Sequence, residues 1–156
     1  MTGWRIGYAA GNSSVISAMN NLSGQSTSNP TSISQKAAIE AFSGNQDKVK
    51  EMLVEFDTRK DYISSFLNNI IGVKCYVPMG AFYVFPDISY YFGKKFKGKT
   101  ISNSIELTDF LLDEGKVAVV PGIEFGSDKH IRISYATSMK DIIEGTKRIK
   151  ESLEKL

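Results

Sequence analysis

Hydrophobic residues recur at spacings of three and four in five stretches of the chain, which predicts five amphipathic helices. The expected helices cover about residues 13–22, 32–44, 47–69, 103–115 and 138–156. The third is the longest and would extend about 35 Å at a rise of about 1.5 Å per residue. A helix of that length can join two separate bodies of a protein.

Polar residues mark where several of these helices should begin, because their side chains can bond free backbone N–H groups of the first turn. A turn with a helix cap is expected at Gly11, Asn12 and Ser13. Capping pairs three residues apart are expected at Ser32 and Gln35, Asn103 and Glu106, and Ser138 and Asp141.

Shorter apolar runs predict strands between the helices. The expected strands are 6–10, 74–78, 81–85, 117–120 and 130–135. After the long helix, the order is therefore β-β-α-β-β-α, which is typical of a compact α+β sandwich with helices on one face of a sheet. The chain as a whole is expected to be of the α/β class.

Composition narrows the class of protein. The chain has 156 residues, of which 42% are hydrophobic and 23% charged, so it can bury a core. A net charge of +2 gives no electrostatic footprint for nucleic acid, and no apolar run is long enough to span a membrane. Cys75 is the one cysteine, and the N-terminal residues do not have the pattern of a secretory signal. Both observations favour a cytoplasmic location.

Charge is unevenly distributed. Residues 1–45 hold only Arg5, Lys36 and Glu40, whereas the other 33 charged side chains follow residue 45. Exposed surfaces normally carry charges throughout. The first segment is therefore expected to be buried, covered by a partner or separated from a larger body.

Two arginines are the candidate binding residues. In a strand, Arg5 would share its face with Gly3 and Gly7, leaving room for a phosphate or carboxylate to approach the guanidinium. Arg132 would share its face with His130, and a carboxylate ligand would satisfy it. A structural carboxylate is the alternative partner for both arginines.

Other chemistry finds little support in the sequence. No phosphate-binding glycine loop follows a strand, and one histidine with one cysteine gives no metal site. Cys75 and His130 could pair as nucleophile and base, but a lone strand cysteine is usually a small hydrophobic residue. The lysine-rich segment 90–100 is expected to be a solvated loop.

Four ordered motifs resemble fold-type-I, pyridoxal-phosphate-dependent aminotransferases (class I/II), especially bacterial aspartate aminotransferases. They are MTGWRIGYAAG at 1–11, SGQSTSNPTSISQKAA at 23–38, PMGAFY at 78–83, and Pro121-Gly122 with Phe125-Gly126 and IRISYA at 131–136. They occur in order from the start of the chain to residue 136, so the resemblance implies that family's fold.

The resemblance also implies roles for single residues. Arg5 would hold the phosphate of the cofactor, and Arg132 the α-carboxylate of the substrate. Gly80, Ala81 and Phe82 would shape the substrate side. Ser26 and Thr27 would approach the cofactor of a neighbouring subunit in a homodimer.

The catalytic lysine of the family stands shortly before the motif that here begins at Met1, so this chain should lack it and be inactive alone. On this interpretation, residues 1–45 are the remnant of a large cofactor domain, 46–72 an interdomain helix, and 73–156 a small domain.

The expected reaction of the family member is transfer of an amino group between an L-amino acid, aspartate, and a 2-oxo acid, 2-oxoglutarate. Two alternatives stay open: a non-catalytic fragment that folds and self-associates, and an aminotransferase of the aromatic or alanine type.

Overall fold

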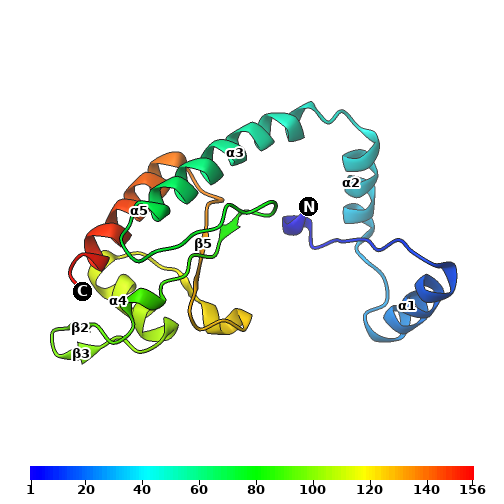
Figure 1. The fold of residues 1–156 in the computed structure, drawn as a ribbon. Coiled ribbons are helices and arrows are strands. Elements are labelled where there is room, and N and C mark those ends of the chain that lie inside the picture. Colours follow the sequence, from blue (N-terminus) through cyan, green and yellow to red (C-terminus); the bar gives the residue numbers. More distant parts are fainter. The chain divides into compact units, whose positions relative to one another are not determined.

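A computed structural model describes the backbone of residues 1–156 and every side chain except that of Thr2. The chain forms two compact units, Met1–Lys50 and Glu51–Leu156. The ribbon in Figure 1 follows the chain from the blue N-terminus to the red C-terminus.

The first unit consists of a short 3-10 turn, η1 (Thr2–Trp4), and two helices, α1 (Ser13–Ser26) and α2 (Ser32–Ser43). The Asn12 carboxamide oxygen caps α1 by accepting a hydrogen bond of 2.9 Å from the Ser14 N–H. The Ser34 hydroxyl donates to the Trp4 carbonyl oxygen at 2.9 Å, which attaches η1 to α2.

This unit has almost no interior of its own. Ser34 is the one buried residue among its described side chains, and α1 buries none. Its large apolar side chains are instead exposed: Trp4, Tyr8, Val15, Met19, Leu22, Ile33, Ile39, Phe42 and Val49. The sparse charge of this segment therefore comes with exposed apolar surface.

The second unit begins within α3 (Asp47–Asn68), whose buried residues all lie in its last turns. At its end, the Asn68 carboxamide donates to the Cys75 carbonyl at 2.7 Å and accepts from the Cys75 N–H at 2.9 Å. Gly72 follows with a φ of +81°, and a Cβ there would lie 2.1 Å from the Tyr90 ring. The turn after α3 thus requires glycine.

A three-stranded antiparallel sheet forms the centre of this unit, in the order β1 (Tyr83–Val84), β5 (Ile131–Ser134) and β4 (Val120–Pro121). Tyr83 pairs with Ser134, and Val120 pairs with Arg132. The central strand is therefore the last of the three along the sequence.

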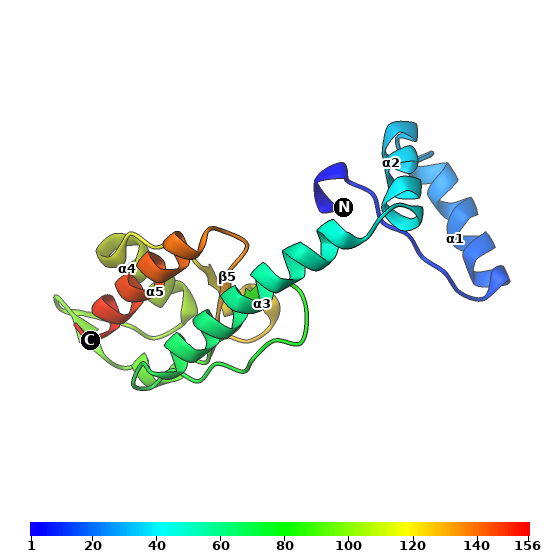
Figure 2. The same ribbon diagram turned by 90° about the horizontal axis from the view of Figure 1, so that it is seen from above.

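Helices α4 (Ser104–Gly115) and α5 (Met139–Leu153) complete the core with α3, and Figures 1 and 2 both show α5 alongside α3. Ser138 caps α5 by accepting from the Asp141 N–H, and Asn103 caps α4 by accepting from the Glu106 N–H. The core comprises Ile63, Leu67, Val84, Leu107, Leu111, Ile131, Ile133, Tyr135, Ile142, Ile149, Leu153 and their neighbours.

The α/β class and the five helices are confirmed, but several strands differ from prediction. Residues 6–10 form no strand, because no described segment pairs with them and a strand needs a partner. Residues 74–78 contribute one isolated bridge, between Lys74 and Asp87. The strand expected at 117–120 corresponds to β4, which begins only at Val120 and ends at Pro121.

Two further predictions change. The loop expected at 90–100 contains a short turn, η2 (Ser89–Tyr91), and a hairpin of β2 (Lys95–Phe96) and β3 (Lys99–Thr100). The capping box at Ser32 is wrong: Ser32 lies inside α2, and the Gln35 amide donates to the Pro30 carbonyl.

Candidate functional site

Arg132 lies at the middle of the central strand, on the face that turns away from the core. Its neighbours Ile131 and Ile133 are buried, whereas Arg132 is half-buried and Ser134 is exposed. This alternation follows from the strand geometry and agrees with the sequence pattern. The core therefore fixes the backbone on one side, while the guanidinium reaches solvent on the other.

Two aromatic rings hold the guanidinium of Arg132. Its central carbon lies 4.4 Å from the ring centroid of Tyr83 and 4.2 Å from that of Phe125. In the described part of the chain, no carboxylate lies within ion-pair distance of Arg132, and no acceptor bonds its N–H groups. A structural salt bridge, the alternative considered from the sequence, is absent among these residues.

The Phe125 ring belongs to η3 (Gly122–Phe125), which follows β4. A Cβ at Gly122 would lie 2.2 Å from the His130 carbonyl oxygen and 2.3 Å from that of Ser127. Only glycine fits there without displacing backbone. The close approach lets η3 turn back against β5 and brings Phe125 to Arg132.

A second attachment holds the same segment. One carboxylate oxygen of Asp128 accepts hydrogen bonds from the Ser104 N–H at 2.9 Å and the Ser104 hydroxyl at 2.6 Å. The Ser104 hydroxyl in turn accepts from the Ile123 N–H at 3.3 Å. The bonds from the Ser104 side chain and backbone lower the pKa of Asp128. This network ties η3 to the first turn of α4.

His130 lies on the same sheet face and extends the aromatic layer. Its ring stacks on Phe85 at 4.7 Å, and Phe85 contacts Phe125 edge-on at 6.2 Å. The Nδ1 atom of His130 shares a hydrogen bond of 2.8 Å with the Ser127 hydroxyl. His130 is therefore part of the packing around Phe125.

The predicted substrate-side residues Gly80, Ala81 and Phe82 form the turn that leads into β1. Ala81 has a φ of +58°, and its carbonyl accepts a hydrogen bond of 3.0 Å from the Tyr135 hydroxyl. The Phe82 carbonyl accepts from the Tyr135 N–H at 2.9 Å. Tyr135 thus fixes both peptide groups, while Gly80 and Ala81 stay exposed.

Arg5 belongs to the first unit and directly follows η1. It is exposed and has a φ of +52°, in the left-handed region. A Cβ at Gly3 or at Gly7 would meet nothing within 4 Å, so the backbone beside Arg5 is open. The face expected of a strand does not exist, but Arg5 still has a glycine two positions before it and another two positions after it.

Ser26 and Thr27 end α1 and bond locally. The Ser26 hydroxyl donates to the Leu22 carbonyl, and the Thr27 hydroxyl donates to the Ser23 carbonyl. Both residues are exposed. These bonds assign no ligand to either residue.

Cys75 and His130 make separate interactions. Cys75 is buried, and burial raises the pKa of its thiol to about 11. Its Sγ atom donates to the neighbouring Tyr76 carbonyl, whereas His130 bonds Ser127. Neither residue has the contacts of a thiol nucleophile activated by a histidine base.

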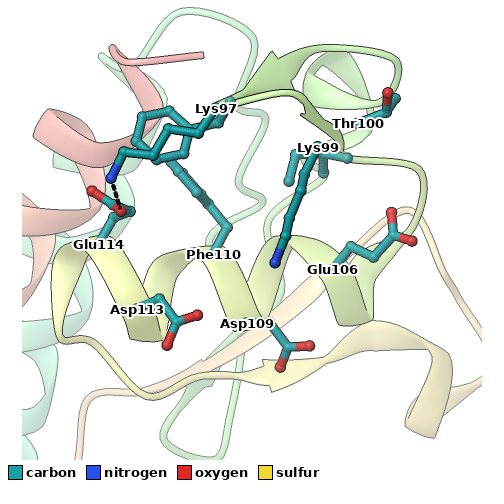
Figure 3. Close-up of a pocket in the computed structure, with 10 residues that line it drawn as sticks. Lys97, Lys99, Thr100, Glu106, Asp109, Phe110, Asp113 and Glu114 are labelled. Atoms are coloured by element: carbon teal, nitrogen blue, oxygen red, sulfur yellow. Dashed lines mark hydrogen bonds and ion pairs between the residues drawn. The ribbon is translucent and has the colours of Figure 1, made fainter.

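A separate cavity of about 500 Å³ lies between the β2–β3 hairpin and α4. Figure 3 shows Lys97 and Lys99 reaching from the hairpin toward the acidic side chains of α4. Lys97 forms an ion pair of 2.9 Å with Glu114, and its hydrogen bond to that carboxylate lowers the pKa of Glu114. These contacts attach the hairpin to the helix.

No described helix is both long and apolar enough to cross a membrane. No three histidine, cysteine or acidic side chains among the described residues lie close enough together to hold a metal ion.

Comparison with known proteins defines the family. The family described as "Aminotransferase class I and II" matches residues 1–149. The chain therefore belongs to the class I and II aminotransferases. It is 51% identical, over its whole length, to the "Probable aspartate/prephenate aminotransferase" of Rickettsia typhi, and 51% identical over 96% of its length to the "Aspartate aminotransferase" of Bacillus sp. strain YM-2.

Solved structures of aminotransferases have the same fold as this chain. The crystal structure of the Rhizobium meliloti aspartate aminotransferase superposes with a TM-score of 0.92 at 44% identity, over all of this chain and 39% of that one. An aromatic aminotransferase from Pyrococcus horikoshii gives a TM-score of 0.84 at 33% identity, over 99% of this chain and 40% of that one. The chain spans 39% of the length of the Rickettsia typhi relative and 37% of the Bacillus one.

Proposed function

We propose that this chain supplies two anion-binding arginines of an aminotransferase that exchanges the amino group of aspartate with 2-oxoglutarate. One observation carries the proposal. Arg132 lies half-buried on the strand face opposite the core, held by two rings, with no carboxylate partner in the described part of the chain. A planar guanidinium of this kind binds a carboxylate through two parallel hydrogen bonds.

Members of this family generally use pyridoxal phosphate. The residues of this chain fit its phosphate end: Arg5 is exposed, the backbone at Gly3 and Gly7 is open, and phosphate groups favour guanidinium donors. When bound, the cofactor supplies an electron sink for bond cleavage at the α-carbon of the amino acid. In the proposal, Arg5 binds its phosphate and Arg132 orients the amino acid by the α-carboxylate.

Gly80, Ala81 and Phe82 complete the proposed substrate side. Two bonds from Tyr135 hold this turn in one conformation, and the Phe82 ring contacts Phe56 of α3 at 6.3 Å. A fixed turn of this kind can limit the shape of the substrate side chain. Aspartate is proposed as substrate because relatives of 51% identity are named for it.

The lysine that moves the proton at the α-carbon is proposed to lie outside these 156 residues, since no lysine here stands in the family motif. The purified chain, mixed with pyridoxal phosphate and reduced with borohydride, should therefore show no stoichiometric lysine label and no transamination. A specifically labelled lysine together with turnover would contradict this part of the proposal.

The catalytic proposal itself needs the rest of the family's length. We expect a fusion of the preceding part of the Bacillus sp. YM-2 enzyme to this chain to transaminate aspartate with 2-oxoglutarate. A panel with alanine and aromatic amino acids tests the alternative specificities. A folded fusion that binds the cofactor but transaminates none of them would refute the assigned function.

Arg132→Ala in that fusion should raise the KM for aspartate about a hundredfold, because two charge-assisted hydrogen bonds are together worth about 3 kcal/mol. Arg132→Lys should recover only part of the loss, since an ammonium lacks the planar fork. Cofactor binding, followed by absorbance, should be unchanged in both variants. An unchanged KM would remove the role assigned to Arg132.

A second candidate is a non-catalytic chain that self-associates, as homodimers are proposed for the family. The exposed apolar side chains of the first unit favour self-association. Light scattering should then show a dimer that dissociates when Met19 and Leu22 of α1 are changed to serine. A monomer at all concentrations would exclude this candidate.

A further inference from the structure

We propose that Tyr83 and Phe125 act as a clamp that fixes the guanidinium of Arg132 and so raises its affinity for a carboxylate. This inference rests on the proposed function, in which that carboxylate belongs to the amino-acid substrate. Tyr83 and Phe125 are positioning residues here, because they touch the arginine rather than the reacting atoms.

The distances between the two rings and the guanidinium of Arg132 are typical of cation–π contacts. Both ring centroids lie within 4.4 Å of the central carbon of the guanidinium, well inside the range of about 6 Å for cation–π attraction. The ring carbons accept no conventional hydrogen bonds, so the contact leaves the five N–H donors of the guanidinium for another partner. A carboxylate bound side-on to the guanidinium would already occupy two of those donors.

The two rings come from different elements of the fold. Tyr83 comes from β1, where it pairs with Ser134 on the same sheet face, and Phe125 comes from η3. Each ring is itself supported: Tyr83 packs on Phe82 at 4.5 Å, and Phe125 contacts Phe85, which stacks on His130. The clamp is therefore built from both sides of β5.

The two rings also reduce the conformational entropy that the Arg132 side chain loses when it binds a carboxylate. A free arginine side chain loses rotamer freedom when it is fixed. A side chain that the rings already restrict loses less of that freedom when a carboxylate binds, so its affinity rises. Each ring is worth about 0.5–1 kcal/mol at a partly exposed site, which corresponds to about twofold to fivefold in affinity.

The test uses the full chain labelled with ¹⁵N. The Nε–Hε signal of Arg132, assigned with Arg132→Lys, reports the order of the side chain through its heteronuclear NOE and reports binding during a titration with 2-oxoglutarate. We expect Phe125→Leu and Tyr83→Leu each to lower the NOE and to raise the dissociation constant of 2-oxoglutarate about twofold to fivefold.

Three matched variants separate a clamp from a general loss of structure. Tyr83→Phe and Phe125→Tyr keep a ring and should retain the native NOE and affinity. Tyr76→Leu removes an aromatic ring that is 87% exposed and should change neither.

The two failures are distinguishable. A wild-type chain that binds 2-oxoglutarate at Arg132, with an unchanged NOE and affinity in both leucine variants, overturns the clamp and leaves the proposed function intact. A wild-type Arg132 signal that does not respond to 2-oxoglutarate contradicts the carboxylate-binding role proposed for Arg132 and the affinity gain together. A loss of NOE and affinity that the ring-retaining variants do not share supports the clamp.

Discussion

At the scale of single residues, Gly122 is the position where the smallest change should have the largest effect on the site. Gly122→Ala would place a Cβ against two backbone oxygens that cannot move away independently. We expect a loss of about 1–3 kcal/mol in the free energy of unfolding, as for other overpacked sites. Urea unfolding of the chain, followed by circular dichroism, measures it.

Gly145→Ala is the matched control. Gly145 lies inside α5, and a Cβ there meets nothing within 4 Å. Alanine should stabilise this helix by about 0.5–1 kcal/mol. Equal effects of the two substitutions would contradict the steric role of Gly122.

Cys75 should be inert in the folded chain. Burial raises its pKa to about 11, so only about a thousandth of the thiol is ionised at pH 8, and the thiolate is the reactive form. Labelling with iodoacetamide at pH 8 should be at least about a hundredfold slower in buffer than in 8 M urea. Rapid stoichiometric labelling of the native chain would show that this region opens readily.

The sequence identified Arg132 and the face it occupies, because alternation along a strand is a local property. It did not identify Tyr83 and Phe125, since no spacing reveals that residues 49 and 7 positions away meet one guanidinium. The one feature of the sequence that pointed to Phe125 was its position between two glycines, Gly122 and Gly126. Whether Arg132, Arg5, Gly80, Ala81 and Phe82 bind ligands stays a prediction.

At the scale of elements, helices followed the sequence closely and strands did not. The caps at Asn103 and Ser138 involve residues within three positions, so their bonds can be read locally. Strand partners lie tens of residues apart, as β1 and β5 do. Residues 6–10 look like a strand by composition, yet nothing in the described chain pairs with them.

The link between η3 and α4 should depend on pH. Hydrogen bonds from Ser104 lower the pKa of Asp128 below its unfolded value, so they stabilise the folded chain above the unfolded pKa. That contribution disappears as the pH falls through the folded pKa, in the acid range below about pH 4. Asp128→Asn should therefore reduce the loss of stability between pH 7 and pH 3.

The urea midpoint of the wild type and of Asp128→Asn at both pH values measures this effect. Other carboxylates with lowered pKa, such as Asp141 and Glu144, are present in both proteins, so their contributions cancel in the comparison. Asp109→Asn, on the exposed side of α4, serves as the control. Parallel losses in all three proteins would exclude a role for the Asp128 charge.

At the scale of the whole molecule, the two units should differ greatly in local stability. The second unit has a continuous core, whereas α1 buries none of its side chains. A helix of 14 residues without packing is marginal in water. In hydrogen–deuterium exchange, amides of α1 should exchange within seconds, while those of β5 stay protected for hours.

Exchange measured at two chain concentrations separates intrinsic from acquired stability. Protection of α1 that grows with concentration would indicate self-association through this unit. Protection of α1 equal to that of β5 at high dilution would contradict the weak interior described for the first unit. The expected division at residues 45 and 72 stays a prediction beside the observed units.

The position of β5 in the sheet has a consequence for synthesis of the protein. β1 and β4 flank β5 but precede it in the sequence, so both leave the ribosome without a partner and cannot pair with each other. About 50 residues separate β1 from the end of β5, which takes about 3–10 seconds to translate at usual rates. During that interval, Val84 and other core side chains are open to chaperones. The sheet can form only when β5 arrives, and the core is complete only after α5 has followed.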